Sequence, residues 1–248
     1  MDSAQLLYLI AGAAFGGFIN GLAGFGTALF ALGFWLQVFP PLQAVAMTVA
    51  VSALTGLQGL WEVRREIGAR PRRLARYLVP AVFGIPLGIY ALAFVRAEAL
   101  QFLIAGFMML YGLFFLLRRR LPVFDRPTPV IDSGIGFAGG VLGGLAGVSG
   151  ALPAMWCGLR PWSRQETRAV LQPFNVAVLG LSAVILAVRG AYTWATLQTL
   201  AVALIVALLT AQLGIVIFRR MSNDAFRWTL IVLMFLSGVG LMARVILL

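Results

Sequence analysis

The sequence predicts an all-α polytopic membrane protein of two inverted repeats, each a glycine-broken, re-entrant helix followed by three transmembrane helices. Three observations lead to this fold class: an apolar composition, a repeated glycine-rich segment and a one-sided distribution of arginine. Of the 248 residues, 61% are hydrophobic and 11% are charged. A soluble domain carries about 25% charged residues, so this composition indicates a chain that lies largely in lipid.

Six charge-poor apolar stretches are long enough to cross a bilayer, which takes about 20 residues of helix. These predicted spans are 42–61, 74–95, 98–117, 167–188, 196–218 and 225–247. Two further apolar stretches, 4–36 and 131–158, are interrupted by glycine. The residues before the first stretch lack the basic region of a cleavable signal peptide, so we expect this stretch to remain in the mature protein.

The two glycine-rich stretches are copies of each other at a spacing of 123 residues. Residues 16–29 (GGFINGLAGFGTAL) align without a gap with residues 139–152 (GGVLGGLAGVSGAL), and eight of the fourteen pairs are identical. Such a repeat indicates gene duplication. We therefore predict a first repeat at 1–124 and a second at 125–248, together forming one integral membrane domain.

The distribution of arginine predicts how the glycine-rich stretches meet the membrane. All 19 basic residues are arginines, and they lie in connectors. If both stretches are re-entrant, 16 arginines lie on one side and three on the other, whereas two fully spanning stretches would give 12 and seven. Cytoplasmic connectors are enriched in Lys and Arg, which favours the first arrangement. Both termini are then non-cytoplasmic, and the odd number of spans per repeat inverts the second repeat.

The glycine breaks predict an anion site inside the bundle. We expect arms of roughly 12–16 residues around breaks at Gly21–Thr27 and Gly144–Gly150, with half-helix N-termini whose free N–H groups attract an anion. The hydroxyls of Thr27 and Ser149 would either cap the second arms or bind the anion. The predicted substrate-binding residues are Asn20, Gly24, Phe25, Gly26, Thr27, Ser52, Gly147, Val148, Ser149, Gly150, Gln172 and Asn175.

Several classes of function are disfavoured by residues that the sequence lacks. The chain has no His and no Lys, and none of its Asp or Glu residues is at the centre of a predicted span. Gly147-Val148-Ser149-Gly150 has the form of a rhomboid-type protease nucleophile, but no base is present to activate the serine. Cys157 is the only cysteine. No enzyme, metal or cofactor is therefore predicted, and the net charge of +11 is assigned to topology and lipid contact rather than nucleic acid.

The glycine-rich break from Gly16 to Gly26, its second copy from Gly139 to Gly147 and the length near 250 residues resemble the TauE/SafE family of sulfite exporters and organosulfur permeases. The resemblance implies a transporter of sulfite, sulfonates or similar small anions in the bacterial inner membrane. We expect a secondary transporter in which one repeat rocks against the other. Its partners would be the small anion and membrane lipids, with a homodimer as the candidate assembly. The alternatives are an exporter of another small solute, such as an amino acid, and a non-transporting membrane scaffold subunit.

Overall fold

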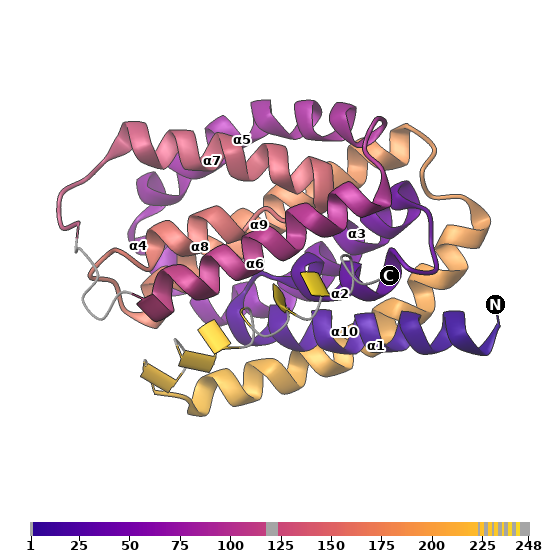
Figure 1. Ribbon diagram of the computed structural model, residues 1–248. Coiled ribbons are helices and arrows are strands. Elements are labelled where there is room, and N and C mark those ends of the chain that lie inside the picture. Colours follow the sequence, from indigo (N-terminus) through magenta and orange to yellow (C-terminus); the bar gives the residue numbers. More distant parts are fainter. Residues whose placement is uncertain are drawn as a thin grey trace.

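The computed structural model describes residues 2–117 and 124–222, with scattered positions between 224 and 243 (Figure 1). Every regular element in these residues is a helix. Within this described part of the chain, six helical segments are long and apolar enough to cross a membrane: Ser3–Ala23, Pro41–Ala69, Pro71–Leu92, Pro129–Ala146, Arg164–Val188 and Trp194–Arg220. Residues 118–123 and most of the last predicted span, 225–247, lie outside the described residues.

The first glycine-rich stretch forms an antiparallel hairpin of α1 (Ser3–Ala23) and α2 (Thr27–Trp35). The indole Nε1 of Trp35, at the end of α2, donates to the carbonyl of Leu9 near the start of α1 (3.1 Å). Between the helices, Gly24 and Gly26 have φ values of +84° and +101°. Only glycine adopts such angles without strain, so these two positions let the chain reverse within three residues.

The second glycine-rich stretch forms a matching hairpin of α7 (Pro129–Ala146) and α8 (Ala151–Cys157). Here Trp156 Nε1 donates to Oδ1 of Asp132 (2.8 Å), and Asp132 is the repeat equivalent of Leu9. Helix α7 ends at Ala146 and is capped by Gly147, whose φ is +67°. The two copies thus share both the glycine turn and an indole hydrogen bond between the arms.

The expected arm lengths and break positions were wrong in detail. The first arms have 21 and 18 residues, and the second arms have 9 and 7. The difference arises because Gly21–Ala23 and Gly144–Ala146 continue the first helix of each hairpin instead of breaking it. Glycine lowers helix propensity by only about 1 kcal/mol, a cost that close packing against a neighbouring helix can offset.

The other predicted spans within the described residues are single long helices. They are α3 (Pro41–Leu60), which continues through the 3₁₀ turn η1 (Trp61–Val63) into α4 (Arg64–Ala69), α5 (Pro71–Leu92), α6 (Ala97–Leu117), α9 (Arg164–Val188) and α10 (Trp194–Arg220). Local sequence sets several starts. Helices α3 and α5 begin with proline, which is preorganised for the first helical position, and α9 begins with a capping box of Ser163 and Glu166.

The most intimate helix pairs connect the two repeats: α1 lies along α10, and α5 lies along α7 (Figure 1). Glycines make both approaches close. A β-carbon on Gly17 or Gly21 would overlap the backbone of Ala207 or Ala211, respectively. Gly17 meets Ala207 and the later residue Gly21 meets the later residue Ala211, so α1 and α10 are parallel. Small residues allow membrane helices to approach at backbone distance, so the hairpin of each repeat is held by the other repeat.

The parallel pairing of α5 and α7 follows the same pattern. A β-carbon on Gly136 would overlap Tyr77, one on Gly140 would overlap Ala81, and one on Gly144 would overlap Ile85. The two helices that remain in the middle, α3 and α9, pack against each other in the opposite sense. Gln172 bonds Gly56 while the later residue Asn175 bonds the earlier residue Ser52, so α3 and α9 are antiparallel.

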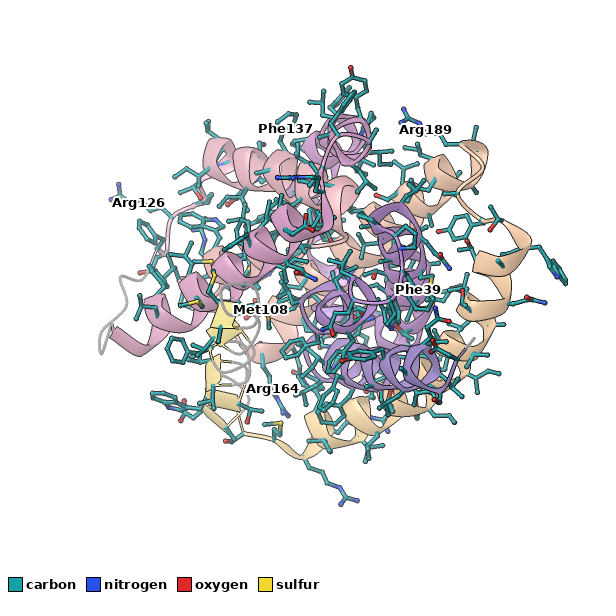
Figure 2. The ribbon with its side chains drawn as sticks, turned by 45° about the vertical axis from the view of Figure 1, so that its right-hand side comes forward. Phe39, Met108, Arg126, Phe137, Arg164 and Arg189 are labelled. Carbon is teal, nitrogen blue, oxygen red and sulfur yellow. The ribbon has the colours of Figure 1, made fainter. Side chains whose placement is uncertain are left out.

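The connectors are sorted between the two ends of the helix bundle. At one end, polar contacts link four of them: Arg70 and Arg73 pair with Glu166, Arg219 pairs with Glu62, and Arg160 donates to the carbonyl of Phe124. The N-terminus and the connectors around 93–96 and 189–193 lie at the other end (Figure 1). Figure 2 shows Arg126 and Arg189 at these opposite ends. The first end holds most of the described arginines and is called the arginine-rich end below.

Candidate functional site

The two glycine breaks meet in the centre of the bundle. A β-carbon placed on Gly150 would lie 2.5 Å from Cβ of Phe25, and one placed on Gly147 would lie 3.4 Å from Cβ of Ala28. Phe25 belongs to the first break and Ala28 follows it directly, so the contact joins break to break. All twelve residues predicted for the substrate site are buried. The two breaks therefore face each other inside the protein.

A chain of hydrogen bonds connects the second break to both central helices. Ser149 Oγ donates to Asn175 Oδ1 (2.6 Å), and Asn175 Nδ2 donates to Ser52 Oγ (3.1 Å). Ser52 and Asn175 are 123 residues apart, so they are the same position in the two repeats. Equivalent positions touch only where an axis relating two copies passes close by. The Ser52–Asn175 bond therefore joins equivalent positions of the sequence repeat across α3 and α9.

Asn20 extends the polar chain to α1. Its Nδ2 donates to the carbonyl of Ser52 (3.0 Å) and to Oγ1 of Thr55 (2.6 Å). Its Oδ1 is buried and has no partner among the described residues. Burying such a group without a hydrogen bond costs about 1–3 kcal/mol, and a bound water or a ligand with an N–H or O–H donor would remove that cost.

The hydroxyls of Thr27 and Ser149 do not cap helices. The N-cap residues of α2 and α8 are Gly26 and Gly150, and neither helix has a side-chain cap. Ser149 instead donates to Asn175, and Thr27 Oγ1 is buried without a partner in the described part of the chain. Within the described residues, Thr27 thus has an unbonded hydroxyl at the first residue of α2.

Arg168 is a site residue that sequence reasoning missed. The sequence places it among the topology-setting arginines of a connector, but its side chain lies in the core and is 1% exposed. Its Nη2 donates to the carbonyl of Gly21 (2.7 Å), its Nη1 to the carbonyl of Leu22 (3.4 Å), and its Nε to Gln172 Oε1 (3.3 Å). The signal was present in the spacing. Positions 168, 172 and 175 recur at four and three residues and so share one face of a helix.

The charge on Arg168 is balanced mainly by helix ends. The carbonyls of Gly21 and Leu22 belong to the last turn of α1, where the helix dipole carries partial negative charge. The ring of Phe218 lies 4.2 Å from the guanidinium carbon. No carboxylate of the described residues lies within 4 Å of this guanidinium. A buried cation without an acid partner is costly, which indicates a functional reason for its position.

The first break lies directly against this cation. A β-carbon on Gly24 would lie 3.4 Å from Cγ of Arg168 and 2.6 Å from Oε1 of Gln172. Nε2 of Gln172 donates to the carbonyl of Gly56 (2.7 Å). The site therefore has a positive charge on one side, and its guanidinium and amide donors are bonded to protein oxygens that an anion would have to replace. Among the described residues, no group of three or more His, Cys, Asp or Glu could hold a metal ion.

A family model for the sulfite exporter TauE/SafE matches residues 9–241, which include both breaks and every helix that contributes to the site. The chain belongs to the TauE/SafE family. TauE/SafE proteins are membrane transporters of sulfur compounds and not enzymes, so the chain is a multi-pass membrane transporter. Neither a search of curated proteins nor a search of solved structures gave a match.

Proposed function

We propose that this TauE/SafE protein is a secondary transporter that binds sulfite or an organosulfonate between its two glycine breaks. The observation that supports the proposal is the buried side chain of Arg168 beside Gly24, whose guanidinium has no carboxylate within 4 Å among the described residues. An anion is the ligand that such a site attracts, because it would give the guanidinium a directly bonded negative partner, whereas the described residues bond it through carbonyl and amide oxygens and Glu62 acts on it from beyond 4 Å. The sulfur chemistry comes from family membership.

The two halves of the proposed site contribute different groups. On the first side, Arg168 supplies charge, and Thr27 supplies a free hydroxyl beside the N–H groups at the start of α2. On the second side, Ser149, Asn175 and Ser52 supply hydroxyl and amide groups. Helix α8 has only seven residues, so the dipole expected from the second break contributes little. The sulfonyl or sulfite oxygens would lie between these halves.

Alternating access is the transport mechanism that we propose, with two inverted repeats at 1–124 and 125–248. The antiparallel packing of the equivalent helices α3 and α9 supports inversion, because a two-fold axis along the membrane normal would make them parallel. Each hairpin packs on the other repeat, so the moving bodies would be composite. One would contain α1, α2 and α10, and the other α5, α7 and α8.

A labelling experiment tests this topology. Gly68→Cys lies at the arginine-rich end, Arg189→Cys lies at the opposite end, and the native Cys157 is buried. In intact cells, a membrane-impermeant maleimide should label Arg189→Cys at once and Gly68→Cys only after permeabilisation. Labelling of Gly68→Cys in intact cells would contradict the proposed orientation.

Flux in proteoliposomes tests the substrate class. We expect saturable uptake of labelled sulfite, with competition by sulfoacetate or thiosulfate and none by neutral amino acids at the same concentration. Competition by amino acids alone would favour the export of another solute. Absence of any saturable anion flux from monodisperse, correctly oriented protein would exclude the transport proposal and favour the scaffold alternative.

A further inference from the structure

The arginine-rich end contains an open pocket that is separate from the two breaks. Its cavity has a volume of about 210 Å³, where a single water molecule needs about 15 Å³. The lining comes from three connecting regions: the start of α5, the segment before α7 and the segment after α8. The lining residues are Arg70, Arg73, Arg76, Asp125, Arg126, Pro127, Asp132, Arg160 and Trp162.

The pocket carries more positive than negative charge. Five arginines line it against two aspartates, and two positive charges remain even when Glu166, which pairs with Arg70 and Arg73, is included. Asp132 does not neutralise the rest. It is buried, and it already accepts from Arg160, Tyr77, Thr128 and Trp156. The surplus charge therefore belongs to arginines at the pocket wall.

The guanidinium groups of two of these arginines make no hydrogen bond to a carboxylate among the described residues. Arg76 has its nearest carboxylate oxygen on Asp132 at 3.8 Å, beyond hydrogen-bond distance. The guanidinium of Arg126 has no partner among the described residues, although its backbone carbonyl accepts from Arg160. The buried side of the pocket is formed by an arginine that is already hydrogen-bonded. Arg160 is buried, it donates to the carbonyls of Phe124 and Arg126, and its Nε has no hydrogen-bond partner in the described part of the chain.

We propose that this pocket binds a phosphate-like oxyanion, with Arg76 and Arg126 as its principal ligands and Trp162 as one wall. The guanidinium of Arg73 stacks on the ring of Trp162, 4.0 Å from its centre, and this contact holds both side chains in place at the pocket wall. The charged donors of the arginines would bind the oxyanion oxygens. Two sources share this chemistry: a free oxyanion in the aqueous phase, and the phosphate of an anionic lipid head group. The site does not depend on the proposed transport activity.

Binding can be measured on the purified full-length protein from its tryptophan fluorescence during thermal unfolding. One arm titrates inorganic phosphate or sulfate against chloride at constant ionic strength, in nanodiscs of phosphatidylcholine. A second arm replaces part of that lipid with phosphatidylglycerol and adds no phosphate. A stabilising shift in the first arm assigns the pocket to a free oxyanion, and a shift in the second arm alone assigns it to a lipid head group.

Matched variants decide whether the shift comes from the pocket. R76Q/R126Q should weaken binding about tenfold or more, since it removes two charged donors. R65Q/R72Q removes the same charge from exposed positions at the same end that do not line the pocket, and it should bind as the wild type does. R126A alone, on an exposed segment, covers the case in which the double variant does not fold. No shift in either arm, or equal responses of the pocket and control variants, would overturn the proposal.

Discussion

The two glycine breaks have nearly the same backbone and very different neighbours. Each follows a long first arm and precedes a short second arm, and each turn uses a glycine with positive φ. The first break lies against Arg168 and Gln172, whereas the second lies against Thr48 and Val49. Val45 and Val49 are the repeat equivalents of Arg168 and Gln172. The sequence repeat thus provides the hairpin twice, but among the described residues the buried arginine flanks only the first break.

This asymmetry separates what the hairpins need for folding from what the site needs for binding. The parts that both halves keep are the turn glycines, the indole bond between arms and the close helix contact with the other repeat. The parts that differ are charge and hydrogen-bonding groups. Substitutions of the features that both hairpins share should therefore lower stability in either half. Substitutions of the charged and hydrogen-bonding groups, which differ, should impair transport only at the break where the group lies.

The largest effect is expected where a shared glycine contact is filled. In Gly21→Ala the new methyl group would overlap three backbone atoms of Ala211, and in the equivalent Gly144→Ala it would overlap the carbonyl oxygen of Ile85. Both should lower the free energy of unfolding, Gly21→Ala by about 3 kcal/mol and Gly144→Ala by less. Gly134→Ala is the control, because nothing lies within 4 Å of its new methyl group. Thermal unfolding and the yield in detergent would show whether Gly21→Ala destabilises the protein most, Gly144→Ala less and Gly134→Ala least. A harmless Gly21→Ala would refute the α1–α10 packing.

The next largest effect is expected from removing the charge of Arg168 beside the first break. Arg168→Gln should raise the KM for the anion roughly 10- to 100-fold, because a charged hydrogen bond is worth about 1.5–3 kcal/mol. Arg168→Lys keeps the charge and should recover part of the loss. Thr48→Val, beside the second break, removes only a bond to the carbonyl of Ala44 and should leave KM unchanged. Equal KM values for the wild type and a folded Arg168→Gln would remove Arg168 from the site.

Most of the fold could be predicted from the sequence, because length, apolar composition and the repeat determine helices and hairpins. Five predicted spans match helices within a few residues, and the hairpins follow from glycine. The exchange of hairpins between repeats could not be predicted, since glycine at 17, 21, 140 and 144 shows that a neighbour comes close but not which one. Arg168 was missed for a related reason. Arginines that gather on one side of the membrane usually mark cytoplasmic connectors. Only the structure shows that the end of α1 lies beside Arg168.

A smaller effect is expected from Ser149→Ala in the second break. The substitution removes the donor to Asn175 Oδ1 and leaves that buried oxygen without its bond. We expect a loss of about 1–2 kcal/mol in the free energy of unfolding, together with reduced flux. Asn175→Ala removes both bonds of the amide and should cost more. If Ser149→Ala alters neither stability nor flux, the Ser149–Asn175–Ser52 chain has no part in binding.

The smallest structural effect, and the most selective functional one, is expected from Thr27→Val. The side chains have nearly the same shape, and Thr27 Oγ1 makes no hydrogen bond within the described residues, so stability should stay the same or rise slightly. The repeat equivalent of Thr27 is Gly150, which means that the second break has no hydroxyl at this position. A raised KM with unchanged unfolding temperature would therefore place the anion against the first break. An unchanged KM would leave Arg168 as the only contact on that side and shift the expected position of the anion toward Ser149 and Asn175.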